Sequence, residues 1–313
     1  MRVLVAGVGS IGRRHLRLLR EHQEVTDIVA YRRSVVGDID GVNEFDDIDE
    51  VLDLDPDVAF ITNPTHLHVK TAIRCARAGC DIFIEKPLSN DREGVDELCS
   101  LAVERDLVTM VGCQLRFTPI LDFVNELIAN KELGSVLSFE AYSGSYLPDW
   151  RPNQDYRESY SADPDAGGGA VLDLIHEIDY THWLFGPFDE ICGRVGRVSS
   201  LKIDSEDTAL MTLRSNQVLG SIHVDYCRPV PRRTLEVVFD EGVVTADFIE
   251  QTVTVEGRDG GKKESFNYER DEIFRRQLNH FFKSVDQRKS TFNDVQEGKE
   301  VLNLALKAKS SHR

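Results

Sequence analysis

A short apolar segment ends in a carboxylate, an amine and a proline. The apolar run at 82–84 predicts a buried strand, and Glu85, Lys86 and Pro87 follow it directly. Ligands of open parallel sheets bind at the carboxyl ends of the strands, so a lysine placed there can meet the bound ligand. Its amine can hydrogen-bond a substrate hydroxyl and favour the alkoxide as hydride leaves. The alternative is that Glu85 and Lys86 form a solvated strand end before a turn.

Three glycines near the start of the chain have the GxGxxG spacing of a dinucleotide-binding turn. They stand between an apolar strand predicted at 3–6 and a helix-compatible run at 13–21. The first glycine permits a tight turn, the second lets the pyrophosphate approach the backbone, and the third allows close packing of helix on strand. Unpaired N–H groups at the helix start favour phosphate. The predicted residues of this turn are Gly7, Gly9, Ser10, Ile11 and Gly12. The alternative is a glycine turn that binds nothing.

Two arginines stand where a dinucleotide-binding protein contacts the adenosine ribose. A second strand is predicted at 27–31, and Arg32 and Arg33 follow it about 20 residues past the glycines. NAD-binding proteins usually present an acid there, whereas guanidiniums can pair with the 2′-phosphate of NADP. The sequence therefore favours NADP over NAD. The alternative is that both arginines are solvated and that the protein accepts either cofactor.

A third strand end leads to the same edge of the predicted sheet. Asn63 and Pro64 halt an apolar strand and cap a helix predicted at 66–78. Strand, turn and helix bring both residues to the edge that also carries the glycine turn. We expect His66 and His68 to be surface residues at the helix start rather than metal ligands.

A histidine near the middle of the chain is a candidate general base. A helix is predicted at 170–184, where Asp173, His176 and Asp179 follow one another at intervals of three and Tyr180 lies four residues after His176, so they would share one face. A face with two acids and an imidazole is costly to bury as core. His176, positioned by a neighbouring carboxylate, could therefore exchange a proton with the substrate.

A loop predicted at 147–162 is long for a compact domain, and such loops are usually functional. Trp150 and Tyr156 could stack on a sugar or a base, and Arg151 and Arg157 could bind an anion. This combination predicts a substrate that carries a phosphate or a carboxylate. The alternative is an aromatic plug packed on the sheet, which we prefer for Tyr160.

These motifs together carry a resemblance. The chain resembles the Gfo/Idh/MocA family of NAD(P)-dependent oxidoreductases in the order of four motifs, which are Gly7-x-Gly9-x-x-Gly12, Thr62-Asn63-Pro64 with His66, Ala78-Gly79 and Glu85-Lys86-Pro87. The resemblance implies an α/β protein with an N-terminal Rossmann domain at 1–117. It also implies a substrate-binding and oligomerisation domain at 118–313, of α+β type with an open, mostly antiparallel sheet. Alternating apolar and polar residues at 137–141 and 222–226 agree with antiparallel strands.

The resemblance also implies roles for particular residues. The signature lysine of the family matches Lys86, which implies a catalytic role. The family places an aspartate and a histidine, usually four residues apart, at the start of a helix. Here Asp173 and His176 are three apart and Leu172 holds the usual position, so His176 is the firmer assignment. Arg116 is expected to face the active site, and an ion pair at a domain interface is the alternative.

The predicted site thus has three groups of residues and no metal ligands. The catalytic residues are Lys86, His176 and Asp173. The cofactor-binding residues are Gly7, Gly9, Ser10, Ile11, Gly12, Arg32, Arg33, Asn63, Pro64, His66, Glu85 and Lys86. The substrate-binding residues are Arg116, Trp150, Arg151, Tyr156, Arg157 and Asp179.

Two functions from different classes remain open. The first is hydride transfer between the nicotinamide of NADP or NAD and a secondary alcohol or ketone of a sugar or sugar nucleotide. The second is a non-catalytic sensor of the same fold that depends on NAD(P). Retention of both Lys86 and His176 favours the enzyme, since a sensor needs no proton path. The resemblance also implies a homodimer or homotetramer.

Composition excludes several other classes. The net charge of −17 disfavours a nucleic-acid partner, because phosphate contacts need a basic face. Adaptation to high salt would explain this charge, but solubility alone would also do so. The six cysteines lack metal-ligand spacing, which predicts a reducing compartment without structural zinc. We expect no membrane span, no signal peptide and a cytoplasmic location.

Overall fold

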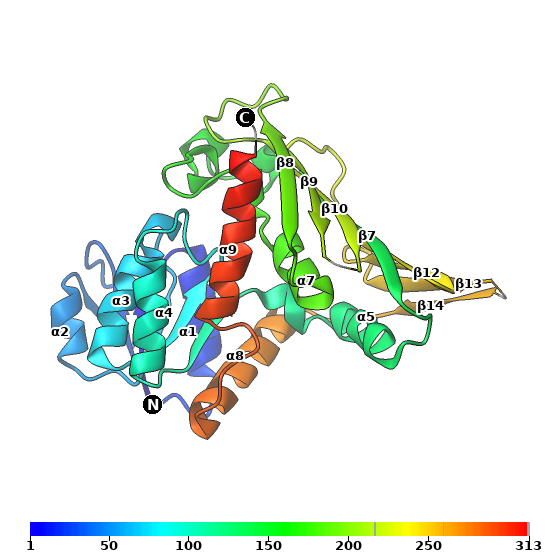
Figure 1. The fold of residues 1–313 in the computed structure, drawn as a ribbon. Coiled ribbons are helices and arrows are strands. Elements are labelled where there is room, and N and C mark those ends of the chain that lie inside the picture. Colours follow the sequence, from blue (N-terminus) through cyan, green and yellow to red (C-terminus); the bar gives the residue numbers. More distant parts are fainter. Residues whose placement is uncertain (216, 259, 312–313) are drawn as a thin grey trace. The chain divides into compact units, whose positions relative to one another are not determined.

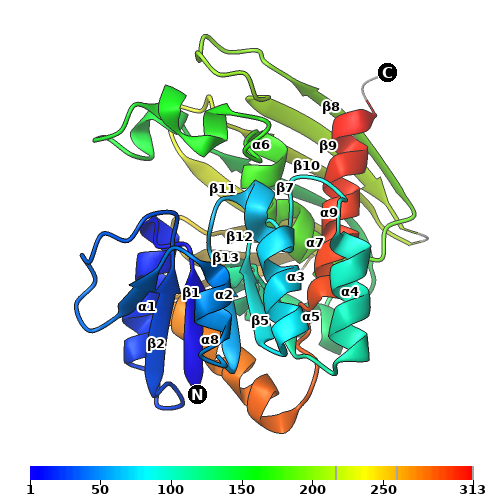
Figure 2. The ribbon, with the colours of Figure 1, turned by 90° about the vertical axis from the view of Figure 1, so that its left-hand side faces the viewer.

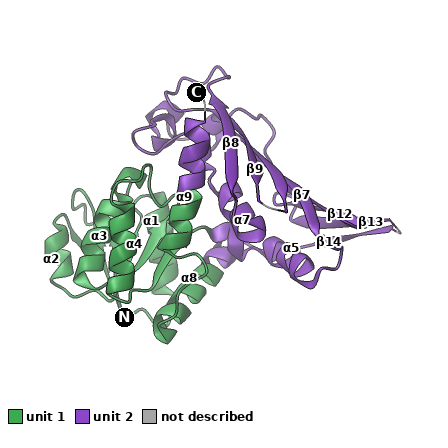
Figure 3. Cartoon of the chain, in the orientation of Figure 1, with its two compact units in different colours: residues 1–113, 275–302 green, residues 114–274, 303–313 purple. Residues whose placement is uncertain are grey.

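The chain folds into two compact units, which are coloured separately in Figure 3. The computed structural model describes residues 1–215, 217–258 and 260–311. One unit is Met1–Cys113 with Arg275–Leu302, and the other is Gln114–Phe274 with Asn303–Arg313. The first boundary therefore lies four residues before the one expected at 117. Residues 275–302 return to the first unit, whereas the sequence prediction assigns all of 118–313 to the second.

The first unit holds a parallel sheet of six strands in the order β3-β2-β1-β4-β5-β6 (Figure 1). The strands are β1 (Arg2–Ala6), β2 (Asp27–Tyr31), β3 (Asn43–Phe45), β4 (Val58–Ile61), β5 (Asp81–Glu85) and β6 (Thr109–Gly112). The central strands β4 and β5 are buried along their whole length, as continuous apolar runs in a covered parallel sheet should be. Strand β3 was not predicted, because three residues carry too little periodicity to be recognised.

Helices cover this sheet, and two of them share one face. The helices with residues in this unit are α1 (Ser10–Arg20), α2 (Ile48–Leu52), α3 (His68–Ala78), α4 (Val95–Glu104), α8 (Arg270–Gln287) and α9 (Val295–Ser310) (Figure 2). His15 of α1 and Phe281 of α8 both pack on the rings of Phe60 and Phe83. Helix α8 therefore completes the core of the first unit. Its amphipathic sequence does not indicate which sheet it covers, and for this reason the sequence prediction assigned residues 275–302 to the second domain.

The second unit holds a sheet of eight strands in the order β14-β13-β12-β11-β7-β10-β9-β8. Only β7 and β10 pair in parallel, and every other neighbouring pair of these strands is antiparallel. The strands are β7 (Val136–Gly144), β8 (Glu190–Gly196), β9 (Thr208–Arg214), β10 (Leu219–Asp225), β11 (Arg232–Phe239), β12 (Gly242–Asp247), β13 (Thr252–Gly257) and β14 (Gly260–Ser265). The expected fold class, a Rossmann domain plus a mostly antiparallel sheet domain, is confirmed.

The helix predicted at 170–184 is broken. Helix α6 (Ala170–Asp173) ends at Leu174, where φ is −99° and ψ is 36°, and α7 (His176–Phe185) begins two residues later. The expectation that Asp173 and His176 share one face of a continuous helix is therefore wrong. Neither a glycine nor a proline marks the break. Instead, Asp173 is held by hydroxyl groups from outside the helix, as described below.

The remaining helical segments of the second unit are short, apart from α5 (Pro119–Asn130). Thr118 caps α5, since its hydroxyl oxygen accepts a hydrogen bond from the backbone N–H of Leu121 at 3.3 Å. The loop expected at 147–162 contains three single turns of 3₁₀ helix, at Leu147–Asp149, Tyr156–Glu158 and Tyr160–Ala162. Among the described residues, no helix combines the length and the apolar character that a membrane span requires.

Candidate active site

The glycine turn has the geometry that its spacing predicts. Gly7 has a φ of +103°, and a Cβ there would lie 2.4 Å from the backbone nitrogen of Asn63. A Cβ at Gly12 would lie 2.1 Å from the carbonyl oxygen of Gly7. A Cβ at Gly9, in contrast, would meet no described atom within 4 Å. The first and third glycines are therefore required by packing, whereas the second leaves the outer side of the turn open to a ligand.

The strand ends that carry the predicted cofactor residues lie side by side. Register pairs Ala6 with Tyr31 and with Ile61, and Ile61 with Ile84, so β2, β1, β4 and β5 end at one edge. The hydroxyl of Thr62 donates to the carbonyl oxygen of Gly7 at 2.6 Å, which ties the end of β4 to the glycine turn. The twelve predicted cofactor residues all belong to this edge of the first unit or to the turn residues that follow it.

His68 joins two of these strand ends. Its Nδ1 lies 2.9 Å from the carbonyl oxygen of Pro87, and its Nε2 lies 2.8 Å from that of Asn63. The side chain is 1% exposed, so the expectation of a surface residue is wrong for His68, whereas His66 is exposed as expected. Burial lowers the pKa of His68, and the hydrogen bonds to Pro87 and Asn63 oppose that shift. The ring therefore lies between the Asn63 turn and the Glu85-Lys86-Pro87 turn, and in its neutral form it can donate to one of the two carbonyl oxygens, because a neutral imidazole carries a single N–H.

A second histidine contacts the strand that delivers Lys86. Nε2 of His15 lies 2.6 Å from Oε1 of Glu85, and both side chains are buried. The other oxygen of Glu85 accepts the backbone N–H of Lys86 at 3.2 Å. A Cβ at Gly112 would lie 3.2 Å from the carboxyl group of Glu85, so the neighbouring strand leaves room for it. Glu85 is thus a buried positioning group, and Lys86 emerges beyond it as a half-buried side chain.

Arg32 does not present an unoccupied guanidinium to a ribose phosphate. Its Nη1 donates to Asp38 at 2.7 Å and to Glu44 at 3.3 Å. Glu44 also accepts the backbone N–H groups of Val36 at 2.9 Å and Gly37 at 3.0 Å. The backbone hydrogen bond from Val36 is the largest cause of the lowered pKa of Glu44, and the one from Gly37 acts in the same direction. Arg33 is exposed. The sequence prediction considered the two arginines without the acids that fold against the first of them.

The second unit carries the predicted proton-transfer and substrate residues. His176 is the first residue of α7 and is 4% exposed. Asp173 accepts hydrogen bonds from three hydroxyls, those of Tyr160 at 2.5 Å, Ser161 at 2.7 Å and Tyr226 at 3.1 Å. Burial, together with the nearby Asp173 carboxylate, raises the pKa of Tyr226. This hydroxyl cluster around Asp173 joins the long loop to Tyr226, the residue that follows β10, which favours a positioning role for Asp173 over proton transfer.

Arg116 and Asp179 are paired with each other. Nε and Nη2 of Arg116 donate to the two carboxylate oxygens of Asp179 at 2.9 and 2.7 Å, and both residues are 1% exposed. Arg116 also lies over the ring of Trp183, 5.7 Å from its centroid. In this bidentate ion pair the guanidinium and the carboxylate neutralise each other inside the second unit. The geometry therefore favours a positioning role for both residues over direct contact with a substrate.

The aromatic residues of the long loop pack on the protein itself. Trp150 stands edge-on to Tyr226 at 5.3 Å, and its Nε1 donates to Ser145 at 2.8 Å. The hydroxyl of Tyr156 accepts the backbone N–H of Lys202 at 3.3 Å. These contacts correspond to the alternative of an aromatic plug. Tyr160 fits the same description, because its hydroxyl bonds to Asp173.

The two arginines of this loop differ in their surroundings. Arg157 forms an ion pair with Asp155 at 2.5 Å, two residues earlier in the same loop. Arg151 is exposed and lies over the ring of Tyr160, 5.4 Å from its centroid. Of the two loop arginines, only Arg151 therefore has the exposed position that was expected of an anion-binding side chain.

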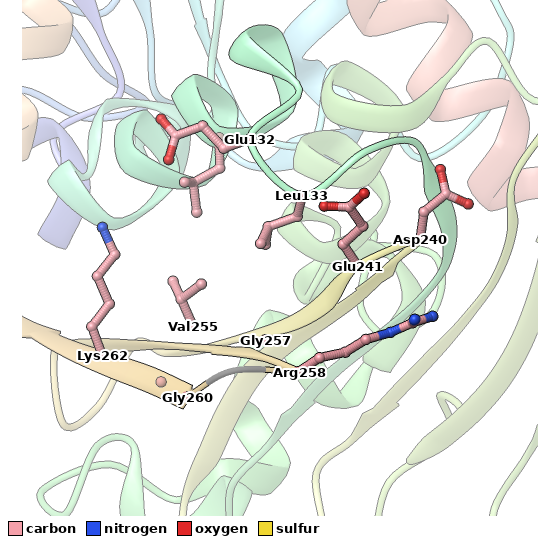
Figure 4. Close-up of a pocket in the computed structure, with 11 residues that line it drawn as sticks. Glu132, Leu133, Asp240, Glu241, Val255, Gly257, Arg258, Gly260 and Lys262 are labelled. Carbon is pink, nitrogen blue, oxygen red and sulfur yellow. The ribbon is translucent and has the colours of Figure 1, made fainter.

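A pocket of the second unit is lined by none of these residues. It has a volume of about 860 Å³ and is formed by the end of α5, by the turn between β11 and β12, and by β13 and β14 (Figure 4). Glu132, Asp240, Glu241, Arg258 and Lys262 supply its charged lining. None of these belongs to the predicted site, and the mixed charge selects no ligand class.

Sequence reasoning missed several partners of the residues that it singled out. His15, Asp38 and Glu44 contact predicted cofactor residues, and Tyr226 contacts Asp173. Their own sequence contexts are unremarkable, since pairs this far apart along the chain meet only in the folded structure. For His15 alone a signal was available, because a helical residue three positions after the last glycine of the turn is expected to face the sheet.

Two family models match consecutive parts of the chain. A model described as an oxidoreductase family with an NAD-binding Rossmann fold, GFO/IDH/MocA, matches residues 1–113. A model of the GFO/IDH/MocA C-terminal domain matches residues 122–245. Together they cover the sheet of the first unit and β7 to most of β12 in the second.

Several characterised proteins are similar to this chain. UDP-N-acetylglucosamine 3-dehydrogenase from Acidithiobacillus ferrooxidans is 27% identical over 99% of this chain and 96% of its own length. Myo-inositol 2-dehydrogenase from Thermotoga maritima is also 27% identical, again over 99% and 96%. Two other relatives are matched over only 64% and 35% of their length. The solved structure of a levoglucosan dehydrogenase with NADH and levoglucosan superposes with a TM-score of 0.88, at 20% identity, over 100% of this chain and 97% of that one.

Proposed function

The chain belongs to the GFO/IDH/MocA family of oxidoreductases, and from this premise we propose that it oxidises a secondary alcohol of a sugar or sugar nucleotide, or catalyses the reverse reduction. The glycine turn carries this proposal. Gly9 leaves the outer side of the turn open, and the N-terminus of α1 points its N–H groups to the same place. These residues fit the pyrophosphate of a dinucleotide. When bound, its nicotinamide would accept or return a hydride at C4.

Lys86 and His176 have separate roles in the proposed reaction. When the alcohol is oxidised, its carbon loses a hydride and its oxygen loses a proton. Lys86 would hydrogen-bond that oxygen and stabilise the alkoxide character that develops on it. His176 would accept the proton, since an imidazole has a pKa suited to this task near neutrality. Glu85 would act through Lys86, because it holds the backbone N–H of that residue.

For the cofactor, we keep NADP as the preferred proposal, with NAD as the alternative. Arg32 and Arg33 support NADP because a 2′-phosphate needs cationic partners. The pairing of Arg32 with Asp38 and Glu44 opposes it. We therefore expect a modest preference for NADP over NAD, with measurable binding of both dinucleotides.

For the substrate, the relatives support a cyclic polyol or a sugar nucleotide, as the names of the inositol and UDP-N-acetylglucosamine dehydrogenases indicate. An anionic group on the substrate stays part of the proposal, now carried by Arg151 rather than by both arginines of the loop. A homodimer or homotetramer in the cytoplasm completes it, supported by the family resemblance alone.

The test is turnover by the intact protein. Wild type and Lys86→Ala are mixed with NAD or NADP and a panel of cyclic polyols, free sugars and sugar nucleotides, and reduced nicotinamide is followed by its absorbance. We expect turnover of at least one compound by wild type and a kcat lower by roughly 10²–10⁴ for Lys86→Ala, with dinucleotide affinity largely retained. Binding of the dinucleotide without turnover of any compound, in either direction, would favour the sensor instead.

A further inference from the structure

One carboxylate of the first unit lies between two guanidiniums beside the glycine turn. Oδ2 of Asp38 accepts from Nη2 of Arg13 at 2.5 Å, and Oδ1 accepts from Nη1 of Arg32 at 2.7 Å. Arg13 directly follows the last glycine of the turn, and Arg32 directly follows β2. Arg13 thus lies near the start of α1, and Arg32 lies just past the end of β2. Both arginines donate to the same carboxylate, which belongs to the protein itself.

Arg32 is held more firmly than the aspartate that it shares with Arg13, and the side chain of Arg13 is itself 45% exposed. The side chain of Arg32 is 19% exposed and is fixed from behind by Glu44, whose side chain is 2% exposed. Asp38 stands on the loop between β2 and β3, and its side chain is 42% exposed. An incoming anion could therefore replace Asp38 without moving Glu44 or Arg32. The two guanidiniums offer donors to two oxygens of one anion, which is how arginines bind phosphate.

The end of β2 is where a Rossmann domain faces the ribose of the adenosine. An NADP molecule differs from NAD there by one phosphate, and the anion position next to Arg32 is already filled. We propose that Asp38 is an internal competitor of the 2′-phosphate, so that NADP binding requires its displacement from Arg13 and Arg32 whereas NAD binding does not. This inference rests on the proposed dinucleotide site and names the residue that sets its cofactor selectivity.

The charge state of Asp38 suits this role. Hydrogen bonds from Arg32, and next from Arg13, lower the pKa of its carboxyl group. It is therefore an anion throughout the neutral range and competes with a phosphate at every working pH. Removing this charge takes away the carboxylate that Arg13 and Arg32 share, while Glu44 still pairs with Arg32.

The test is Asp38→Asn, with Asp40→Asn as the matched control. Asp40 lies in the same loop, is exposed, and contributes only its backbone carbonyl to a hydrogen bond with Arg20, so its replacement changes the net charge equally. Affinities for NADPH and NADH are measured by fluorescence, and those for 2′,5′-ADP and ADP by calorimetry. We expect Asp38→Asn to tighten NADPH and 2′,5′-ADP by about 10- to 100-fold, the size of one charge-assisted contact, and to leave NADH and ADP unchanged. Asp40→Asn should change none of the four.

Other outcomes would overturn the inference. If Asp38→Asn raised the affinities for NADPH and NADH equally, or if the two substitutions had equal effects, Asp38 would act only through the net charge of the protein. Weaker binding of NADH would instead make Asp38 an acceptor for the ribose hydroxyl of NAD. These results are separate from the proposed function, because binding of NADH by wild type establishes the dinucleotide site whichever way the selectivity changes. Thermal unfolding of both variants checks that the loop substitution leaves the fold intact.

Discussion

Nε2 of His15 lies 2.6 Å from Oε1 of Glu85, which joins the helix behind the glycine turn to the strand end that delivers Lys86. The rings of Phe60 and Phe83 enclose this pair at 5.4 and 5.1 Å from His15. The helix that follows the glycine turn and the strand end that carries the proposed catalytic lysine are therefore linked by one buried hydrogen bond.

We predict that Glu85→Leu destabilises the protein and lowers kcat, whereas Glu85→Gln does much less. Leucine leaves the buried imidazole of His15 without its acceptor, at a cost of about 1–3 kcal/mol in the free energy of unfolding, but glutamine keeps an oxygen in that place. Urea unfolding and turnover measure the two effects. A merely structural bond would lower stability without a difference in kcat between correctly folded samples of the two variants.

The hydroxyl cluster around Asp173 makes a second prediction. Asp173→Asn should lower the free energy of unfolding by roughly 1–3 kcal/mol, because three hydroxyls lose a charged acceptor. Its effect on kcat should be far smaller than that of His176→Ala, since Asp173 acts here by anchoring the loop. Denaturant titration and steady-state kinetics on the same samples test this. An unchanged stability with a kcat as low as that of His176→Ala would return Asp173 to the catalytic group.

The Arg116–Asp179 pair predicts a strong dependence of each partner on the other. Arg116→Met should destabilise the protein by roughly 3–5 kcal/mol, because Asp179 would keep a buried charge without a partner. The double variant Arg116→Met/Asp179→Leu should recover most of that loss, because it buries no charge. Equilibrium unfolding of the single and double variants completes the cycle. Additive losses would mean that the pair is not coupled.

His68 predicts how stability depends on pH. Its folded-state pKa is lowered by burial, so as pH falls below the ordinary value of about 6.5 the unfolded chain takes up the proton first. The stability that this residue contributes is therefore complete above about pH 6.5 and is lost as pH falls through the folded pKa. His22, His223 and His280 act in the same direction, since burial lowers their pKa as well.

The matched experiment compares wild type with His68→Gln. Unfolding free energies at about pH 8 and about pH 5.5 should differ less in the variant, because one of the four contributions is gone. An unchanged difference would show that His68 keeps its ordinary pKa in the folded state.

The sequence was informative wherever a local pattern determines the structure. The glycine turn, Asn63 and Lys86 each follow an apolar strand directly, and parallel strands end at one edge, so their positions followed from local order. The partners of those residues did not, because Glu85 meets His15 from 70 positions away. The break at Leu174 could not be predicted either, since it occurs where Asp173 bonds to Tyr226, 53 positions away along the chain, rather than at a helix-breaking residue.

The charges near Arg32 show a second limit. The position of Arg32 after β2 predicts a phosphate contact, but Asp38 and Glu44 fold back onto this arginine from a loop and a three-residue strand. Sequence alone could not say that this arginine is already paired. Cofactor selectivity is therefore the part of the site that most needs the folded structure.

The pH dependence of kcat tests the proposed role of His176 as the group that takes the proton when the alcohol is oxidised. Wild type should lose activity as pH falls through the titration of a single group, because a protonated imidazole cannot accept the proton. His176→Ala should abolish this acid limb and lower kcat by roughly 10²–10⁴, with dinucleotide affinity retained. Near-normal turnover of His176→Ala with the acid limb intact would contradict the account and place the base elsewhere.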